Sequence, residues 1–350
     1  MIHPEISIAG RRIGADHPPY VICELSGNHN GSLDRALAMV DAAADTGCDA
    51  IKIQTYTADT ITLDVDRPEF VIHGGLWDGR SLYELYQEAQ TPFEWHAAIF
   101  ERAAKRGVTI FSSPFDETAV DLLADLGAPA FKIASFEAVD LPLIRYAAAK
   151  GRPLIISTGM ANLAEIEAAR DAALAGGAAG VLLLHCVSSY PATFEDANVR
   201  TVADMAARFG CPVGLSDHTP GTAAAVAAVA MGACAVEKHF TLARADGGPD
   251  SEFSLEPAEF RALVRDTKDA WASLGTVNYD LLGSERGNVQ FRRSLYVTAD
   301  VKAGEVLTRG NVRSVRPGLG LPPADLERVL GRAAARDLVR GEPLAWDMVV

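Results

Sequence analysis

Two lysines lie inside apolar stretches of this sequence, where a positive charge needs a partner. Lys52 occurs in the stretch Ala-Ile-Lys-Ile, and Lys132 occurs in the stretch Ala-Phe-Lys-Ile. Burying an ammonium group costs free energy unless the group meets an anion. The sequence offers two kinds of partner, a salt bridge with Glu24 or Glu237 or an anionic ligand.

Serine hydroxyls follow similar apolar stretches and favour the anionic ligand. Ammonium groups together with several hydroxyl donors suit a phosphate or a carboxylate. Serine is common at strand ends, so no single serine decides the question, but the set predicts an anion site. The candidates are Ser113, Ser135, Ser157, Ser188 and Ser216.

Two histidines follow further apolar stretches. His218 and His239 stand beside the carboxylates Asp217 and Glu237. Imidazoles placed in this way can share a divalent metal and leave open positions for substrate oxygens. The alternative is a pair of hydrogen-bonded core residues, and we favour the metal because both histidines end neighbouring predicted strands. His185 is a further candidate for a third ligand.

The apolar stretches alternate with segments of helical period, which predicts parallel strands joined by helices. Eight such units within about 250 residues are typical of a (β/α)8 barrel. A doubly wound sheet would usually show a Gly-x-Gly-x-x-Gly turn after its first strand, and residues 26–31 lack that spacing. We expect strands at 20–25, 50–55, 108–112, 130–134, 153–157, 181–186, 211–216 and 235–240, and helices near 33–46, 92–106, 117–126, 140–150, 162–175, 199–209, 220–231 and 257–273.

A barrel of this kind places its active site at the C-terminal ends of the strands, which is where the candidate residues fall. Side chains at positions i and i+2 share one face of a strand. Lys52 and Gln54 should therefore point together, as should Glu237 and His239. Lys238 should face the helical layer unless the backbone bends at the strand end.

The connection over residues 56–91 is far longer than usual, and such loops are usually functional or disordered. It contains Trp77 and several tyrosines, so we expect it to be ordered. A short helix over residues 81–89 would place three apolar side chains on one face, those of Leu82, Leu85 and Tyr86.

Composition limits the class of protein. The chain has 350 residues, with 32 Lys and Arg against 46 Asp and Glu and a formal net charge of −14, which argues against nucleic acid or an acidic membrane as a partner. No apolar run reaches the roughly 18 residues of a membrane helix, and the start lacks a secretory signal pattern. Five scattered cysteines without a Cys-x-x-Cys pair indicate a reducing compartment, so we expect a cytoplasmic protein.

The charge is unevenly distributed along the chain. Residues 276–350 carry 11 basic and 9 acidic side chains, whereas the preceding part is strongly acidic. The change falls in a polar, glycine-containing stretch that is typical of a linker. We therefore expect a barrel domain over 1–275, a linker over 276–290 and a small domain of short strands and tight turns over 291–350.

Eight stretches at the predicted strand ends resemble the sialic acid synthase family in their order and spacing, and the tail resembles the antifreeze-like (SAF) domain of that family. Glu-Leu-Ser-Gly-Asn-His at residues 24–29 stands where N-acetylneuraminate synthases usually show Glu-Ile-Gly-x-Asn-His. Residues 54–64 and 75–92 look like the pseudaminic acid branch of the family. The eight stretches lie at residues 24–32, 51–55, 111–116, 131–135, 157–160, 184–191, 214–219 and 237–241.

The resemblance implies a reaction. The family joins phosphoenolpyruvate (PEP) to an amino-sugar aldose and releases phosphate by C–O cleavage. In the pseudaminic acid branch the sugar is 2,4-diacetamido-2,4,6-trideoxy-L-altrose. Water must add to C2 of PEP during this reaction, and the sequence leaves open whether Glu24 or Glu237 accepts its proton.

The resemblance also implies roles for individual residues, carried over at matching positions. PEP would be bound by Lys52, Lys132, Ser113, Ser135, Ser157 and Ser216, and by Ser188, which stands where the family often has asparagine. The sugar side would comprise Glu24, Gln54, Tyr190 and Asp250. The catalytic residues would be Glu24, Lys52, Lys132 and Glu237. His218 and His239 would hold a divalent metal, manganese in preference to magnesium or cobalt. Family dimers exchange their antifreeze-like domains, which matches Arg316 to an arginine that reaches the partner's site.

Three alternatives remain at this stage. An N-acetylneuraminate or legionaminate synthase would use the same chemistry on another sugar. A Schiff-base aldolase would use Lys52 or Lys132 as its nucleophile. A non-catalytic carbohydrate- or ice-binding protein is suggested only by the C-terminal domain.

Overall fold

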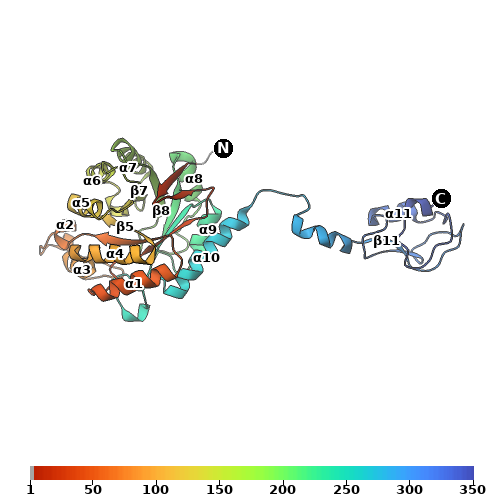
Figure 1. Cartoon of the computed structure of the whole chain (residues 1–350), viewed down its shortest axis with the longest axis horizontal. Coiled ribbons are helices and arrows are strands. Elements are labelled where there is room, and N and C mark those ends of the chain that lie inside the picture. The colour runs from red at the N-terminus through yellow and green to blue at the C-terminus, as the bar shows by residue number, and fades with distance from the viewer. Residues whose placement is uncertain (1–3) are drawn as a thin grey trace. The chain divides into compact units, whose positions relative to one another are not determined.

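The computed structural model describes residues 4–350 and divides the chain into two compact units. The larger unit extends to Gly275, and the smaller unit is Thr276–Val350. Figure 1 shows that the larger unit contains the helices and strands of a barrel, and the smaller unit contains mainly short strands and turns. Each unit has a hydrophobic core of its own.

The larger unit is the predicted (β/α)8 barrel. Its eight parallel strands close into a ring because β10 pairs with both β3 and β9. All eight strands overlap the predicted ranges. They are β3 (Tyr20–Glu24), β4 (Ala50–Thr55), β5 (Thr109–Pro114), β6 (Phe131–Ile133), β7 (Leu154–Ser157), β8 (Val181–Cys186), β9 (Val213–Asp217) and β10 (Ala235–His239).

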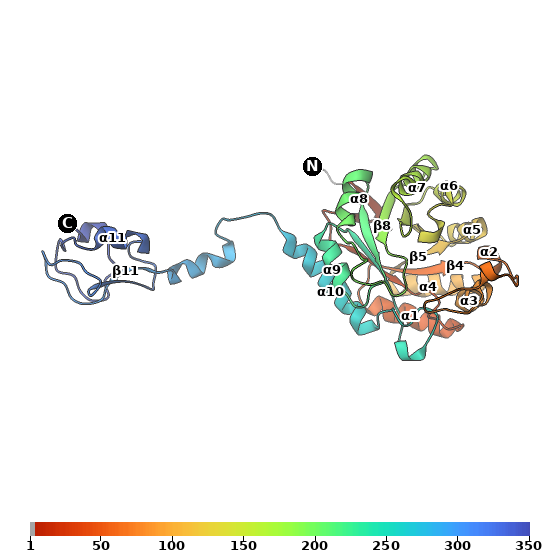
Figure 2. The same cartoon turned by 180° about the vertical axis from the view of Figure 1, so that it is seen from behind.

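The eight predicted helices surround these strands (Figures 1 and 2). Several begin at N-cap residues, such as Ser32 before α1 and Asp116 before α5. The side-chain oxygens of these caps accept hydrogen bonds from free backbone N–H groups of the first turn. The helices are α1 (Leu33–Asp45), α4 (His96–Arg106), α5 (Glu117–Asp125), α6 (Leu141–Ala148), α7 (Leu163–Ala175), α8 (Thr201–Phe209), α9 (Ala223–Ala230) and α10 (Pro257–Leu274).

Alternate residues of the strands belong to two different apolar clusters. Residues such as Val21 and Ile51 pack in the cluster shared with the helices, whereas Ile22 and Ala50 belong to the cluster inside the barrel. This two-residue period is the geometry of a strand. It places Lys52, which follows Ala50 by two residues, on the interior side.

A β-hairpin that the sequence analysis did not predict precedes the barrel. Strand β1 (Glu5–Ile8) pairs antiparallel with β2 (Arg11–Gly14). Its isoleucines, Ile6, Ile8 and Ile13, belong to the same interior cluster as the first residues of the barrel strands. The hairpin therefore covers the N-terminal end of the barrel, opposite the end at which the polar residues gather.

The long connection over residues 56–91 is ordered, as expected. It contains two helices, α2 (Ala58–Ile61) and α3 (Leu82–Ala89), and the short 3₁₀ helix η1 (Pro68–Phe70). Ile72 donates its backbone N–H to the carbonyl of Arg80 at 2.8 Å, which closes a hairpin between η1 and α3. Figure 2 shows α2 and α3 together at the end to which β4 points.

Other short elements complete the chain. The 3₁₀ helices η2 (Phe93–Trp95), η3 (Ser135–Glu137) and η4 (Arg244–Asp246) lie in the connections of the barrel. The second unit begins with η5 (Gly283–Phe291), which overlaps the stretch predicted as a linker. It continues with β11 (Ser294–Val297), β12 (Val312–Val315), η6 (Pro323–Asp325), α11 (Leu326–Val329) and η7 (Trp346–Met348).

Within residues 4–350, the helices include none with both the length and the apolar character needed to cross a membrane.

Candidate active site

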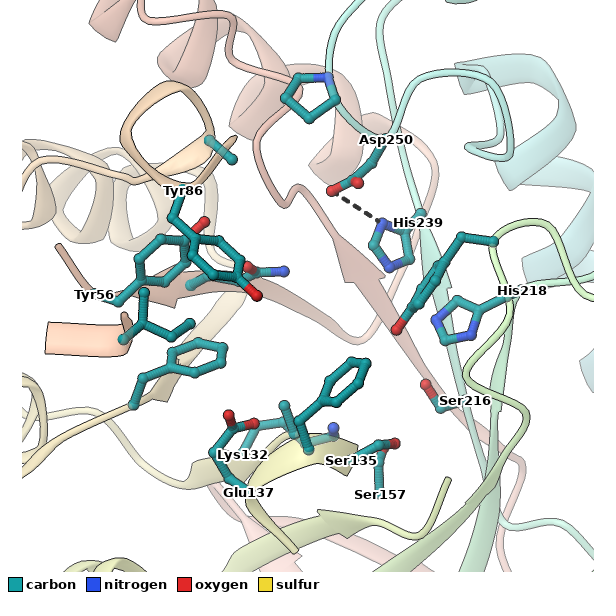
Figure 3. A pocket seen from close by; sticks show the side chains of 18 of the residues that line it. Tyr56, Tyr86, Lys132, Ser135, Glu137, Ser157, Ser216, His218, His239 and Asp250 are labelled. Carbon is teal, nitrogen blue, oxygen red and sulfur yellow. Dashed lines mark ion pairs between the residues drawn. The ribbon is translucent and has the colours of Figure 1, made fainter. Parts of the chain in front are cut away.

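A pocket of about 490 Å³ opens at the C-terminal ends of the barrel strands. Figure 3 shows Lys132, Ser135, Glu137 and Ser157 along one side of it, with Ser216, His218, His239 and Asp250 on another. Most of the residues predicted from the sequence line this pocket. They are Lys52, Gln54, Lys132, Ser135, Ser157, Tyr190, Ser216, His218, Glu237, His239 and Asp250.

Lys52 lies between two buried carboxylates at the base of the pocket. Its Nζ is 2.7 Å from Glu237 Oε1 and 3.3 Å from Glu24 Oε2. Burial alone would lower the pKa of Lys52, but the two carboxylates outweigh burial and raise it. The salt bridge that the sequence suggested is therefore present, with both partners, and it holds Lys52 in its charged form.

Glu237 lies near more positively charged groups than Glu24 does. Its Oε1 accepts a hydrogen bond from Ser216 at 3.3 Å and also lies 3.8 Å from Lys132 Nζ. Burial would raise the pKa of Glu237, but Lys132 and Lys52 outweigh burial and lower it. Burial raises the pKa of Glu24, because Lys52 and the amide of Gln54, at 2.8 Å from Glu24 Oε1, offset only part of the desolvation.

Lys132 is buried and has weaker ion pairing than Lys52. Its nearest carboxylate oxygen is that of Glu237, and it donates to the backbone carbonyl of Ile133 at 3.3 Å. Burial lowers the pKa of Lys132 to about 8, and Glu237 opposes only part of that effect. An ammonium held in this way gains from an added anion, because the anion would supply the charge that the protein leaves uncompensated.

Two serine hydroxyls near these lysines lack partners within the part of the chain that the structure describes. The Oγ atoms of Ser113 and Ser157 are buried without a hydrogen bond. Ser135 Oγ accepts from the backbone N–H of Gly159 at 3.2 Å, which leaves its own proton available. Buried polar groups are usually satisfied, so these hydroxyls are consistent with an oxygen-rich ligand between them and the lysines.

The two histidines fit a divalent metal. His218 and His239 have ring centroids 5.3 Å apart, and His218 Nδ1 lies 2.9 Å from the carbonyl of Val187. That contact leaves His218 Nε2 with a free lone pair, the usual arrangement of a metal-binding imidazole. His239 Nδ1 is buried, has no hydrogen-bond partner among residues 4–350, and lies 4.0 Å from Asp250 Oδ2.

The pKa values of the two imidazoles are shifted in opposite directions. Burial lowers the pKa of His239 well below its usual range, so its ring is neutral, the form that binds metals. Burial would also lower the pKa of His218, but the Cys186 sulfur outweighs burial and raises it. Among residues 4–350 no cluster of three or more potential protein ligands occurs, so a metal held here would keep positions open.

Four of the predicted site residues do not line the pocket. Glu24 lies behind Lys52 and Gln54, and Ser113 is buried beside the pocket. Ser188 Oγ is 3.8 Å from Cys186 Sγ, a pocket-lining atom. Arg316 follows β12 in the second unit, where it is exposed.

Two further expectations concern neighbouring residues. His185 does not join the other histidines, because its Nε2 contacts the carbonyl of Ala197 at 2.8 Å. His185 follows Leu184 of the interior cluster by one residue, so strand geometry turns it outward. Lys238 lies on the outer side as predicted, where it is buried and pairs with Asp217 at 2.7 Å.

Glu137 lines the pocket and was not predicted from the sequence. It ends η3, two residues after Ser135, and its Oε2 is buried without a partner among the described residues. Burial raises the pKa of Glu137 to about 7, and Lys132 opposes part of that rise. Its position two residues after Ser135 was the only hint in the sequence. A single 3₁₀ turn is too short to show a periodic pattern, so the sequence could not show that Glu137 faces the pocket.

The sequence analysis also assigned no function to the aromatic and aliphatic side of the pocket. Tyr56 and Tyr86 lie there, across the pocket from His218 (Figure 3). The Tyr56 ring contacts Tyr86 at 5.8 Å and Phe115 at 5.1 Å between centroids. Cys186, which had no predicted role in the site, lines the pocket as well.

Known proteins resemble this chain along most of its length. A pseudaminic acid synthase of Campylobacter jejuni is 44% identical over 329 residues, which cover 94% of this chain and 96% of that protein. An N,N'-diacetyllegionaminic acid synthase of Legionella pneumophila is 34% identical over 342 residues, 96% of each chain. The crystal structure of an N-acetylneuraminic acid synthetase from Leptospira borgpetersenii, in complex with citrate, matches with a TM-score of 0.73 and 32% identity, covering 83% of this chain and 96% of that one.

Family profiles divide the chain in the same way as the fold does. The NeuB family profile matches residues 39–279, which is most of the barrel, and the SAF domain profile matches residues 292–350. The barrel, the SAF domain and the identity to several synthases agree with the resemblance seen in the sequence. This chain therefore belongs to the NeuB family.

Proposed function

We propose that this protein condenses PEP with 2,4-diacetamido-2,4,6-trideoxy-L-altrose, the reaction of a pseudaminic acid synthase. The identity of 44% to the Campylobacter jejuni pseudaminic acid synthase, against 34% to the legionaminic acid synthase, supports this sugar. The observation that carries the proposal is the pocket itself, which is lined by two lysines, several serines and two histidines. Figure 3 shows Lys132, Ser135 and Ser157 on a different side of it from His218 and His239.

PEP would bind at the polar side of the pocket. Lys132 and the free hydroxyls of Ser113 and Ser157 would receive its phosphate and carboxylate oxygens, and Lys52 would add its charge. Hydrogen bonds from charged donors to such oxygens are among the strongest in proteins. The same ammonium groups would stabilise the phosphate as it departs.

His218 and His239 would hold the divalent metal, for which we propose manganese, with magnesium or cobalt as alternatives. Bound there, the metal would act as a Lewis acid toward the aldehyde oxygen of the sugar. Gln54, Tyr190 and Asp250 line the same region of the pocket and would orient the sugar.

Two carboxylates of the protein would stabilise the positive charge that develops on PEP and accept the proton of the attacking water. C3 of PEP attacks the aldehyde carbon and a C–C bond forms. The C=O π bond of the aldehyde breaks, its oxygen takes up a proton from solvent to become a hydroxyl, and positive charge develops at C2. Glu237, held ionised by its donors, would stabilise that charge. Water then adds at C2 and gives its proton to Glu24, which has fewer donors and so retains more basicity toward the water. The tetrahedral hemiketal phosphate collapses by C–O cleavage and releases phosphate.

We also propose a homodimer in which the SAF domain of each chain serves the other chain's barrel. Arg316 would then supply a guanidinium to the substrate bound by the partner, a role that suits its bidentate geometry. Exposed apolar side chains follow the strand ends of the barrel, among them Phe136, Met160 and Phe194. They support an interface at that end of the barrel.

The five cysteines are free and buried. A set of reduced thiols is typical of intracellular proteins of mesophiles. This supports the cytoplasmic location that we propose for the reaction.

The second candidate is a legionaminate or N-acetylneuraminate synthase, which the matches at 34% and 32% identity favour. A panel of amino sugars with PEP and manganese, with phosphate release as the signal, separates these candidates. We expect the altrose derivative to give the highest kcat/KM. A higher value with another sugar of the panel would replace our proposal by the corresponding synthase, and borohydride trapping of a pyruvate adduct would indicate an aldolase instead.

A further inference from the structure

One side of the active-site pocket is apolar, in contrast to the lysines, serines and carboxylates of the other side. We call this side the apolar wall and define it as Ile61, Ile72, Leu82, Leu85 and Tyr86. All five residues come from the long connection over residues 56–91. None of them belongs to the two hydrophobic clusters of the barrel, so their apolar surface serves the pocket and not the barrel core.

The apolar wall is held in place by contacts within its own segment. The hairpin between Ile72 and Arg80 fixes one part, and the cap that Ser81 forms at the start of α3 fixes another. The backbone N–H of Ala58 donates to Gln90 Oε1 at 3.0 Å and ties α2 to the end of α3. A wall with this many local supports is a preformed binding surface.

Trp77 connects the same segment to the metal side of the pocket. Its Nε1 donates to the carbonyl of Pro249 at 2.8 Å, next to Asp250, and its ring lies 5.6 Å from that of Tyr190. Tyr86 lies across the pocket from His218 and His239 (Figure 3). A sugar with its aldehyde at the histidines would therefore extend its other end toward the apolar wall.

We propose that the apolar wall binds the methyl-bearing end of the sugar, namely the C6 methyl and a neighbouring acetamido methyl, and so selects 6-deoxy sugars over sugars with a C6 hydroxyl. This inference rests on the proposed function, because it takes an amino-sugar aldose as the second substrate. The physical reason is desolvation. A C6 hydroxyl placed against Ile61, Ile72, Leu82 and Leu85 loses its hydrogen bonds to water, and these aliphatic side chains offer none in return.

The size of the effect has a natural limit. An apolar pocket rejects an analogue that adds one hydroxyl by up to about 100-fold in kcat/KM. We therefore expect the 6-deoxy sugar to exceed its 6-hydroxy counterpart by about 10- to 100-fold. A larger preference would require a further source of discrimination.

The test compares these two sugars in the full-length protein with PEP and manganese. Leu82→Asn keeps nearly the same side-chain shape, Ile72→Thr shortens the side chain by one heavy atom, and both add polar groups to the wall. We expect both variants to lose most of the preference, mainly through a lower kcat/KM for the 6-deoxy sugar. Leu63→Asn is the matched control, since Leu63 lies in the same segment, is 61% exposed and does not line the pocket. It should leave the preference unchanged.

Two results would overturn the inference while leaving the proposed function intact. One is equal kcat/KM for both sugars in the wild type, and the other is an equal loss for both sugars in the wall variants. If no amino sugar supports phosphate release, the proposed function fails, and the wall is then judged by binding. A larger rise in Tm with the 6-deoxy sugar than with the 6-hydroxy sugar, abolished by Leu82→Asn, would support the wall, and equal rises would refute it.

Discussion

At the scale of single residues, the two active-site lysines have different electrostatic settings. Lys52 contacts two carboxylates and keeps its charge. Lys132 lies 3.8 Å from Glu237, and burial lowers its pKa. Breaking a buried ion pair leaves an uncompensated charge and is strongly destabilising. Lys52 is thus structural as well as functional, and Lys132 is the better probe of ligand binding.

The pKa of Lys132 near 8 predicts how PEP binding depends on pH. Below that pH the ammonium is charged and attracts phosphate, and above it the free enzyme loses this charge. We expect kcat/KM for PEP to fall as the pH rises through about 8, which a pH profile at low PEP concentration measures. The Lys132→Arg variant is the control, because a guanidinium does not deprotonate in this range. If kcat/KM for PEP still falls through about pH 8 in Lys132→Arg, the group that titrates is not Lys132.

Removing either histidine tests the metal site. We expect His218→Ala and His239→Ala to lower turnover by about 10²- to 10³-fold, the range of several kcal/mol that a Lewis acid supplies. Calorimetric titration with manganese should show weakened binding in both variants. His185→Ala is the matched control, since His185 contacts the carbonyl of Ala197 and lies away from the pair. Metal-free turnover at the wild-type rate in either variant would refute the assignment.

At the scale of elements, the barrel strands explain why much of the site could be predicted. Lys52, Gln54, Glu237 and His239 obey the two-residue period of β4 and β10, so their shared orientation follows from the sequence alone. Glu137 could not be found in this way, because it lies on a single 3₁₀ turn. The hairpin β1–β2 was missed because its two strands, Glu-Ile-Ser-Ile and Arg-Arg-Ile-Gly, lack the continuous apolar run that marked the barrel strands.

The apolar wall shows a different limit of sequence reasoning. The helical period correctly placed Leu82, Leu85 and Tyr86 on one face of α3. Which partner that face meets depends on the fold of the whole connection, including the hairpin that brings Ile72 to the same place. Local periodicity defines a face, but only tertiary structure shows that the face borders a cavity.

The turn after β7 offers a prediction about positioning. A Cβ added at Gly159 would overlap Ser188 Oγ and lie 2.8 Å from Ser135 Oγ, so at least one serine must move. We expect Gly159→Ala to lower kcat/KM for PEP by about 10- to 100-fold, because small displacements of binding groups have effects of this size. Steady-state kinetics with varied PEP measures it.

The control for this variant is Gly283→Ala, where an added Cβ meets nothing within 4 Å. Both variants should unfold at nearly the wild-type temperature. Unchanged PEP kinetics in Gly159→Ala would show that Ser135 and Ser188 do not bind PEP.

At the scale of the whole molecule, net charge and local charge point in different directions. The formal net charge of −14 argues against nucleic acid as a partner. Two lysines nevertheless line the pocket, and they suit an anionic ligand. The net charge therefore governs long-range electrostatic attraction and repulsion. The specificity for a ligand depends on the few side chains that the barrel brings together in the pocket.

The second unit supplies a prediction about assembly. If Arg316 serves the partner's site, Arg316→Ala should lower kcat/KM by about 10- to 100-fold, the range for a hydrogen bond to a charged group. Arg313→Ala is the matched control, because Arg313 is an exposed arginine of β12 only three residues away. Wild-type kinetics in Arg316→Ala would remove Arg316 from the site.

Mixing two impaired variants tests the exchange between subunits. Co-expressed Arg316→Ala and Lys132→Ala chains should recover part of the activity if each site combines residues of two chains. Failure to recover any activity would indicate that each chain completes its own site.

The central claim is that the barrel joins PEP to the diacetamido-trideoxy sugar with cleavage of the C–O bond of PEP. Its most direct test uses PEP labelled with ¹⁸O in the bridging oxygen, together with the wild-type protein, manganese and that sugar. Mass spectrometry of the released phosphate reads the result. The account predicts that the label leaves with the phosphate; label retained in the sugar acid, or no phosphate released, would contradict it.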